Sequence, residues 1–418
     1  MSCNWPRVQI SEVCELIVDC VNKTAPRVDY KTPFKMIRTP NVKGGKISLN
    51  DCRFVEEDTY EKWTRRAKVL RDDVLLTREA PMGEVGIVDF DETVFLGQRI
   101  MQYRVDRSKL DPHFLLYSFL SSDLQHQFSM HEGSGSVVSH IRVPDCSKFE
   151  LNLPPLDVQK EIAGVLKKLD RKISVNQQTN QTLEQMAQAI FKSWFVDFDP
   201  VKAKMNGEQP EGMDAATASL FPEKLVESEL GLIPEGWEIK PFSEWVKITK
   251  GKNITKKTIV DGDVPVVAGG LKPAYFHNAH NVDGPAITIS ASGANAGYVN
   301  LYFENIWASD CSYISQSTTP MFFLQYVALR YNQKKIFDMQ TGAAQPHIYP
   351  RDFERLMIVV PNEELCRKLE CVFVSFFGTV ANNKQQNIEL AALRDTLLPK
   401  LLSGEIELGQ AQELAEVD

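Results

Sequence analysis

The chain has 418 residues, 43% of them hydrophobic and 24% charged, which is the composition of an ordinary globular protein. Its formal net charge of −8 excludes a uniformly basic surface, and its eight cysteines are too scattered for a disulfide framework or a metal site. It shows no export signal and no apolar run as long as a membrane span, so we expect a cytoplasmic protein that does not contact a membrane.

Residues 1–155 are predicted to form a first globular domain. Short apolar stretches at 74–76, 85–88 and 149–151 predict strands, and the spacing of apolar residues at 112–128 predicts a helix. Gly- and Pro-containing turns separate these elements. The alternation of short strands with a helix is typical of a mixed α/β fold.

A long helix follows, within a helical region at 156–199. Apolar residues recur every three or four positions from Asp157, the expected N-cap, to Phe195. The aromatic residues from Phe191 to Phe198 suit packing better than stacking on bases. Residues 200–236 are predicted to be a polar linker.

The second half of the chain repeats this order. A second domain is expected at 237–361, with strands at 286–289 and 298–301 and a helix at 320–330. A second long helix is expected at 362–406, in which Pro399 predicts a kink or a break. Residues 407–418 are predicted to be an acidic tail.

The two halves are related by an offset of 207 residues (383 − 176 = 207). His140 and Ile141, for example, correspond to His347 and Ile348. Duplication of a domain followed by a long helix predicts two similar heads, joined by two antiparallel helices with approximate two-fold symmetry. Paired asparagines would fix the register of these helices. The predicted pairing positions share the apolar or asparagine stripe and are Ile162, Leu166, Leu169, Ile173, Asn176, Asn180, Leu183, Leu369, Phe373, Phe376, Val380, Asn383, Asn387 and Leu390.

The sequence contains no motif for catalysis, cofactor binding or metal binding that we recognise. It lacks a P-loop, a GxGxxG loop, a GxSxG elbow and an HExxH pair, so we expect no cofactor and no metal. The acidic residues concentrate in 208–235 and after Lys400, while basic runs occupy 31–46, 62–71 and 247–257.

Two different heads on paired helices can touch two places on one duplex, and the scaffold then sets the distance between half-sites. Polar and basic loop residues at corresponding places in the two heads are the candidates for DNA contact, although each also fits a solvated surface residue. They are Arg38, Asn41, Lys43, Lys46, Thr77, Arg78, Ser134, Ser136, Lys250, Lys252, Asn253, Lys256, Lys257, Ser292, Asn295 and Gln345.

Four motifs give the chain a resemblance to a known family. They are LPPLDVQKEI at 153–162, FKSWFVDFDPV at 191–201, SELGLIPEGW at 228–237 and LPKLLSGEI at 398–406. The chain resembles, over nearly its whole length, the specificity (S) subunits of Type I restriction–modification enzymes. It departs from them at 360–365, where VPNEEL replaces the family's Pro-Pro-Leu-x-x-Gln opening.

The resemblance implies a non-catalytic subunit with two target-recognition domains for a bipartite site in double-stranded DNA. It implies helices that dock methyltransferase (M) subunits, with restriction (R) subunits joining the assembly. Flipping of the methylated base would belong to the M subunit. Two alternatives stay open: a protein-only adaptor, which predicts no salt-sensitive DNA binding, and a divergent DNA-modifying enzyme, which would bind S-adenosylmethionine or a divalent metal.

Overall fold

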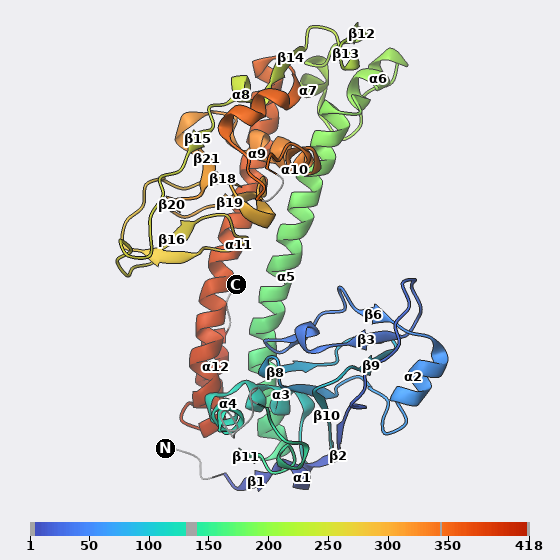
Figure 1. The fold of residues 1–418 in the computed structure, drawn as a ribbon. Helices are drawn as coiled ribbons and strands as arrows, with labels where there is room; N and C mark the ends of the chain where they lie inside the picture. The colour runs from blue at the N-terminus through green and yellow to red at the C-terminus, as the bar shows by residue number, and fades with distance from the viewer. Residues whose placement is uncertain (1–4, 131–139, 343–344, 416–418) are drawn as a thin grey trace. The chain divides into compact units, whose positions relative to one another are not determined.

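The computed structural model describes residues 5–130, 140–342 and 345–415, which form two units (Figure 1). The first unit takes the chain up to Val175 and again from Gln386 on, and the second takes Asn176 to Gln385. Each long helix is therefore divided between the units, so each unit is described by itself.

The first unit is built on a four-stranded antiparallel sheet in the order β2-β10-β7-β8. In β7, Val74 and Leu76 face the cluster that contains the helices, whereas Leu75 faces a second apolar cluster. Both faces of the sheet are thus buried, which explains why this strand appears as a continuous apolar run. The strands are β2 (Cys14–Asp19), β10 (Ile100–Val105), β7 (Val74–Arg78) and β8 (Met82–Ile87).

Smaller sheets and short helices complete the first unit. The helix predicted at 112–128 is two helices, because the Ser121 side chain accepts a hydrogen bond from the backbone of Leu124 and so caps the second one. The small sheets are β1 (Arg7–Gln9) with β11 (Glu150–Asn152), then β6 (Arg53–Phe54), β3 (Lys35–Ile37) and β9 (Val94–Leu96), and the hairpin of β4 (Val42–Lys43) and β5 (Lys46–Ile47). The helices are α1 (Ile10–Val13), η1 (Thr39–Asn41), α2 (Glu57–Trp63), α3 (Pro112–Leu120), α4 (Ser122–Ser129) and η2 (Val143–Asp145).

The second unit repeats the topology of the four-stranded sheet, the three-stranded sheet and the β1–β11 pair, but it has no counterpart of the β4–β5 hairpin among its described residues. Its four-stranded sheet has the order β15-β21-β18-β19, and its three-stranded sheet, β17-β16-β20, contains a parallel pair just as β6-β3-β9 does. The predicted duplication of a mixed α/β head is confirmed. The elements are β14 (Glu238–Pro241) with β22 (Met357–Val360), β15 (Thr249–Lys250), β16 (Val264–Val267), β17 (Tyr275–His277), β18 (Ala286–Ser290), β19 (Val299–Tyr302), β20 (Trp307–Ala308), β21 (Cys311–Ser315), α8 (Phe242–Trp245), η3 (Gly293–Asn295), η4 (Gln316–Thr318), α9 (Phe322–Tyr331), α10 (Gln333–Asp338) and η5 (Pro350–Arg355).

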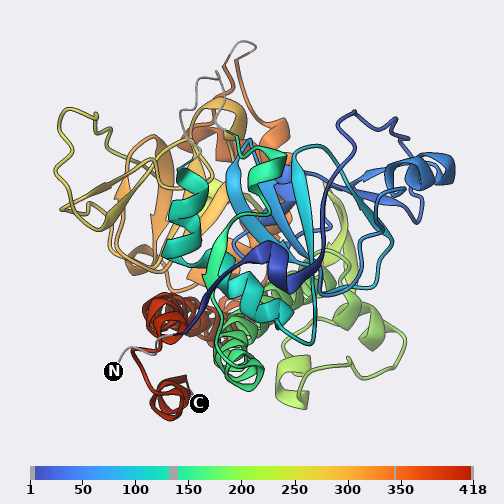
Figure 2. The same ribbon diagram turned by 90° about the horizontal axis from the view of Figure 1, so that it is seen from below.

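Two long helices, α5 (Leu156–Phe195) and α11 (Glu363–Ser403), run close to their predicted bounds. The first half of α5 lies beside the last half of α11 in one unit, and the reverse holds in the other, so the pairing is antiparallel (Figures 1 and 2). Of the two alternatives predicted at Pro399, a kink or a break, the break is wrong: α11 continues to Ser403. Proline removes only one donor there, and the carbonyl that loses it belongs to the exposed Asp395.

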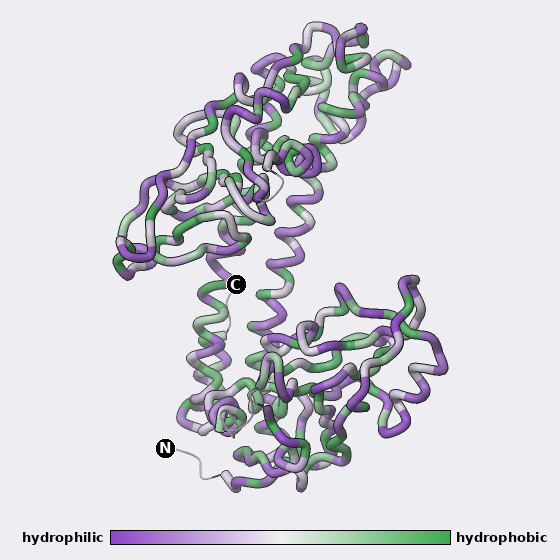
Figure 3. The backbone as a smooth tube through the Cα atoms, in the orientation of Figure 1, coloured by the Kyte–Doolittle hydropathy of each residue, from purple (hydrophilic) through white to green (hydrophobic). Residues whose placement is uncertain are grey.

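The predicted pairing stripe also holds the heads in place. Its apolar members belong to the same two apolar clusters as the sheets, so each stripe packs on the partner helix and on a head at once. Apolar and polar residues accordingly alternate along both helices (Figure 3). The buried members are Ile162, Leu166, Leu169, Ile173, Asn176, Asn180, Leu369, Phe373, Val380 and Leu390, and the half-buried ones are Leu183, Phe376, Asn383 and Asn387.

The segment expected to be a polar linker is folded. The rings of Phe195 and Phe198 lie 5.7 and 5.8 Å from that of Trp237, and Trp194 meets Phe221 edge-on at 5.1 Å. The aromatic residues of the family motif therefore pack, as expected. This segment contains α6 (Asp199–Met205), α7 (Ala215–Ser219) and the hairpin of β12 (Leu225–Ser228) and β13 (Gly231–Pro234), and the predicted tail contains α12 (Leu408–Ala415). Within the described residues, none of the helices has the length and apolar character needed to cross a membrane.

Glu370 on α11 is buried at the start of α9. Its two carboxylate oxygens accept hydrogen bonds from the backbone N–H groups of Phe323 (3.0 Å) and Leu324 (2.8 Å). In the first unit the start of the corresponding helix, α3, is capped by Asp111, the residue that directly precedes it. Burial raises the pKa of the Glu370 carboxyl above its usual 4.5, although the two backbone donors oppose the shift.

This shift predicts how stability depends on pH. A carboxyl whose pKa is raised by folding stabilises the fold below its unfolded pKa and loses that contribution as the pH rises through its folded pKa. We therefore expect the wild-type protein to lose stability relative to Glu370→Gln between about pH 4 and about pH 7. Urea unfolding of both proteins at the two pH values measures this, and a constant difference would contradict it.

Candidate nucleic-acid interface

A basic pocket lies beside the three-stranded sheet of the first unit. Its volume is about 270 Å³, and the cationic side chains that line it are Lys23, Arg38, Arg53 and Arg99. They come from separate places in the sequence: a loop, the end of β3, β6, and the turn after β9. The parallel pairing of β3 with β9 and the antiparallel pairing of β3 with β6 bring these segments together. We call this cavity the arginine pocket.

The arginine pocket is electrostatically suited to an anion, because no carboxylate lines it. Arg38 donates from Nη2 to the Asp51 carbonyl at 2.9 Å, but its Nε is buried and has no partner among the described residues. Arg99 forms an ion pair with Glu79 at 2.7 Å. A buried donor without an acceptor is costly, and an incoming acceptor removes that cost.

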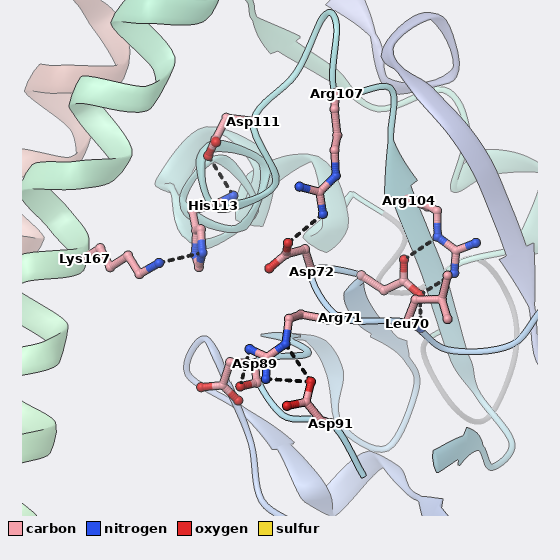
Figure 4. Close-up of polar contacts among 11 residues, drawn as sticks. Leu70, Arg71, Asp72, Asp89, Asp91, Arg104, Arg107, Asp111, His113 and Lys167 are labelled. Atoms are coloured by element: carbon pink, nitrogen blue, oxygen red, sulfur yellow. Dashed lines mark hydrogen bonds and ion pairs between the residues drawn. The ribbon is translucent and has the colours of Figure 1, made fainter. Parts of the chain in front are cut away.

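Two arginines of the second basic run, at 62–71, are paired with carboxylates. Figure 4 shows that Arg71 points at Asp91, and the two side chains are 2.8 Å apart. Arg66, in the same run, is paired with Asp19. On the neighbouring surface Arg107 is paired with Asp72 at 2.6 Å. Exposed ion pairs of this kind leave little net positive charge for a polyanion.

Candidates in the β4–β5 hairpin lie near α5. Lys43 and Lys46 are exposed, and the Lys46 ammonium donates to the Ser174 hydroxyl on α5 at 2.7 Å. On the same side, the ring of His113 and the Lys167 ammonium are 3.0 Å apart (Figure 4). Burial, together with the charge of Lys167, lowers the pKa of His113, which keeps the ring neutral near pH 7. The hairpin lysines remain available for contact with DNA.

Three other candidates of the first unit form hydrogen bonds inside the fold. The hydroxyl of Thr77 is buried and accepts from the backbone of Glu84 at 3.0 Å. The side-chain amide of Asn41 bonds to the backbone of Arg38 and of Asn50, and Arg78 donates to a backbone carbonyl at 3.0 Å. Thr77 and Asn41 therefore have structural roles, whereas the Nε of Arg78, like that of Arg38, is buried without a hydrogen-bond partner among the described residues. Ser134 and Ser136 lie outside the described residues.

The second unit presents a different surface, centred on Tyr349. The His347 ring stacks on it with centroids 5.9 Å apart, while the Lys250 ammonium and the Arg351 guanidinium lie 5.9 and 5.5 Å from its centre. We call these four residues the Tyr349 platform. A ring flanked by cations offers both a stacking face and positive charge to a nucleic acid.

The remaining candidates of the second unit lie in nearby loops. Ser292 bonds to Asp310 through its hydroxyl and forms a backbone bridge to His347, so it supports the Tyr349 platform. Asn295 ends the short helix η3. The exposed candidates are Lys252, Asn253, Lys256, Lys257 and Gln345.

The sequence predicted Arg38 of the arginine pocket and Lys250 of the Tyr349 platform, but it did not predict most of the other residues of these two surfaces. Arg53, Arg99, Tyr349 and Arg351 had no signal of their own, because they come together only through strand pairing and loop folding. The described residues contain no group of three or more His, Cys, Asp or Glu side chains placed to hold a metal ion.

A larger cavity, of about 440 Å³, marks the place where the second unit departs from the family motif. In the first unit the side chain of Gln159 is buried, and its Oε1 accepts a hydrogen bond from the backbone N–H of Asp111 at 2.9 Å. At the offset of 207 its counterpart is the shorter Cys366 (159 + 207 = 366), which lines the cavity. Carboxylates such as Glu363 also line it, so it is less suited to an anion than the arginine pocket is.

Comparison with known proteins supports an origin in one family. The model of the Type I restriction modification DNA specificity domain matches residues 3–185 and 234–391. The chain is 28% identical over 404 residues to the Type I restriction enzyme HindI specificity subunit of Haemophilus influenzae, covering 81% of this chain and 87% of that protein. It is 25% identical over 358 residues to the MjaIX specificity subunit of Methanocaldococcus jannaschii, covering 80% and 78%.

The fold agrees with a solved structure. The crystal structure of a Type I restriction–modification S subunit from M. genitalium matches 95% of this chain and 96% of its own, with a TM-score of 0.56 and 18% identity. Because the family model matches two segments that together span most of its length, the chain belongs to the family of specificity subunits of Type I restriction–modification enzymes.

Proposed function

We propose that each unit of this chain reads one half of a bipartite site in double-stranded DNA. The observation that carries the proposal is a duplicated fold with two different polar surfaces, the arginine pocket in one unit and the Tyr349 platform in the other. Because the two units share a fold, they would dock on DNA in the same way. Because their polar surfaces differ, the two half-sites would differ in sequence.

We further propose that α5 and α11 dock the methyltransferase subunits, to which restriction subunits are added. Both helices carry apolar side chains exposed to solvent, which is typical of a surface that a partner covers. This chain would then be non-catalytic, and the methyltransferase would flip and modify the base. The exposed apolar residues are Val175 and Met186 on α5, with Val372, Val374 and Ile388 on α11.

Exchange of one head tests the assignment of half-sites. Replacing Trp237 to Pro361 with the matching domain of a relative is expected to change one half of the methylated site and to leave the other half unchanged. Mapping of methylated bases in DNA treated with the hybrid complex measures this. A change in both halves would show that the units do not read separately.

Salt dependence tests whether the complex binds the phosphate backbone. The chain alone carries a net charge of −8 and is expected to bind DNA weakly, whereas its complex with the methyltransferase is expected to bind specifically. Affinity of the complex should fall steeply with salt, because phosphate contacts release counterions. Titration of labelled duplex at several salt concentrations gives the slope, and a flat response would favour the protein-only adaptor.

Shortening both helices tests whether they set the spacer. Deleting one heptad from each, at positions 207 apart, shortens each helix by about 10 Å. That length corresponds to roughly three base-pair steps, so the preferred spacer should shorten by that amount while the half-site sequences stay the same. Methylation of duplexes with a series of spacers measures the preference, and an unchanged spacer in a folded variant would refute the idea.

A further inference from the structure

One layer of the helix pair in the first unit is ionic. Asp170 on α5 and Arg394 on α11 are 2.8 Å apart, and the Tyr117 hydroxyl on α3 donates to the same carboxylate at 2.8 Å. The two charged side chains are only 24% and 27% exposed. Arg394 also pairs with the exposed Asp395 on its own helix at 2.7 Å. A partly buried carboxylate that loses its cation is costly, so Asp170 depends on Arg394.

The duplicated layer in the second unit is apolar. At the offset of 207, Asp170 corresponds to Phe377 (170 + 207 = 377), and Arg394 corresponds to Ala187 (394 − 207 = 187). Phe377 is 1% exposed and Ala187 is 0% exposed, within one apolar cluster. Tyr326 meets the Phe377 ring edge-on at 5.3 Å. The same layer of the repeat is therefore ionic once and apolar once.

The asparagine layer, in contrast, is the same on both helices. The Asn383 side chain donates to that of Asn180 at 2.8 Å. Their counterparts are Asn387 (180 + 207 = 387) and Asn176 (383 − 207 = 176). Paired asparagines fix register, but a layer with asparagine at every position cannot distinguish α5 from α11.

The ionic layer can make that distinction. If α5 paired in the same register with α5 of a second copy of this chain, Asp170 would face Ala187 of that copy and lose its cation. If α11 paired with a second α11, Arg394 would face a phenylalanine. We propose that the Asp170–Arg394 pair selects the partner helix, so that α5 binds α11 and not a second α5.

Charge reversal in the full-length chain tests this proposal. Asp170→Arg places two cations in the layer and Arg394→Asp places two anions, so each variant alone should be destabilised. Mixed and refolded together, the two chains can form a dimer by exchange, in which α5 of each pairs with α11 of the other and both ion pairs reform. The dimer competes with an intramolecular effective concentration in the millimolar range, so refolding is done at about 0.1 mM.

Native mass spectrometry of one isotope-labelled and one unlabelled variant identifies the mixed dimer. Its fraction should exceed the dimer fraction of either variant alone by about tenfold or more. The double variant D170R/R394D should stay monomeric and be more stable than either single variant, because its ion pair is restored within one chain. It should remain less stable than wild type, because the arginine introduced at position 170 cannot accept the hydrogen bond that Tyr117 donates to Asp170, and the aspartate introduced at position 394 stands beside Asp395. The matched control E161R makes the same charge change at an exposed position of α5 and should neither lower stability nor cause exchange.

Two results would overturn the proposal: a refolded mixture that contains no mixed dimer, and a double variant no more stable than the single variants. If the single variants misfold when refolded alone, the experiment still works, because formation of folded mixed dimer on refolding them together is then measured. None of these measurements involves DNA, so they stand or fall separately from the proposed recognition function.

Discussion

Replacing Phe377 with alanine is expected to lower the free energy of unfolding by about 3 to 5 kcal/mol. The ring is 1% exposed, stacks on Phe323 at 5.0 Å and meets Tyr326 edge-on at 5.3 Å. It thus joins α11 to α9 of the second unit. Truncation removes the ring from this packing and leaves a cavity that rigid neighbouring helices cannot fill. Urea unfolding followed by circular dichroism measures the decrease.

A neighbouring substitution on the same helix provides the control. Val374 is 46% exposed, so Val374→Ala should change stability by less than about 0.5 kcal/mol. Similar decreases in both variants would show that the second unit is not held to α11 through this aromatic packing.

Removing the three arginines of the arginine pocket is expected to weaken specific DNA binding on the order of a hundredfold or more, since hydrogen bonds to charged groups contribute roughly 1.5 to 3 kcal/mol each. The variant replaces Arg38, Arg53 and Arg99 with glutamine. If the three side chains bind phosphates, the slope of log affinity against log salt should become shallower by about 0.9 for each phosphate that is no longer neutralised. Titrating labelled duplex with the methyltransferase complex gives both values.

The control for this variant removes the same charge elsewhere in the first unit. Arg107, Lys109 and Lys148 are exposed, do not line the arginine pocket and are paired with carboxylates, so their replacement by glutamine should have a much smaller effect. Equal decreases in affinity for both triple variants would mean that net charge, not the pocket, governs binding. Relaxed specificity at one base position, with an unchanged salt slope, would instead indicate that the arginines bind a base.

The long helices and the duplication could be predicted from the sequence because they repeat a signal many times. An apolar stripe along a helix of 40 residues specifies that helix even where single positions such as Asn180 are polar. Strands of two residues, such as β15 (Thr249–Lys250), carry no such repetition. Their place depends on register with distant strands, here Tyr313 and Ser312, which no local pattern encodes.

The candidate DNA-binding residues could be predicted only in part, for two physical reasons. Polarity alone suggested Thr77, but the register of β7 shifts between Leu76 and Arg78, and the Thr77 hydroxyl satisfies a backbone donor of the next strand at that irregularity. The sequence also did not indicate that residues far apart in the chain would line one pocket. Arg53 and Arg99 meet only because β6 and β9 flank the same strand.

The division of the long helices between the units sets an order for folding during synthesis. The second unit is continuous, from Asn176 to Gln385, so its core is complete once α11 has half emerged. The first unit is not: its apolar cluster includes Leu390, Leu397 and Leu401 from the end of the chain. At the usual rate of synthesis the whole second unit takes on the order of tens of seconds to appear. The domain that leaves the ribosome first is therefore the last to finish its core, and it must stay soluble with α5 uncovered until then.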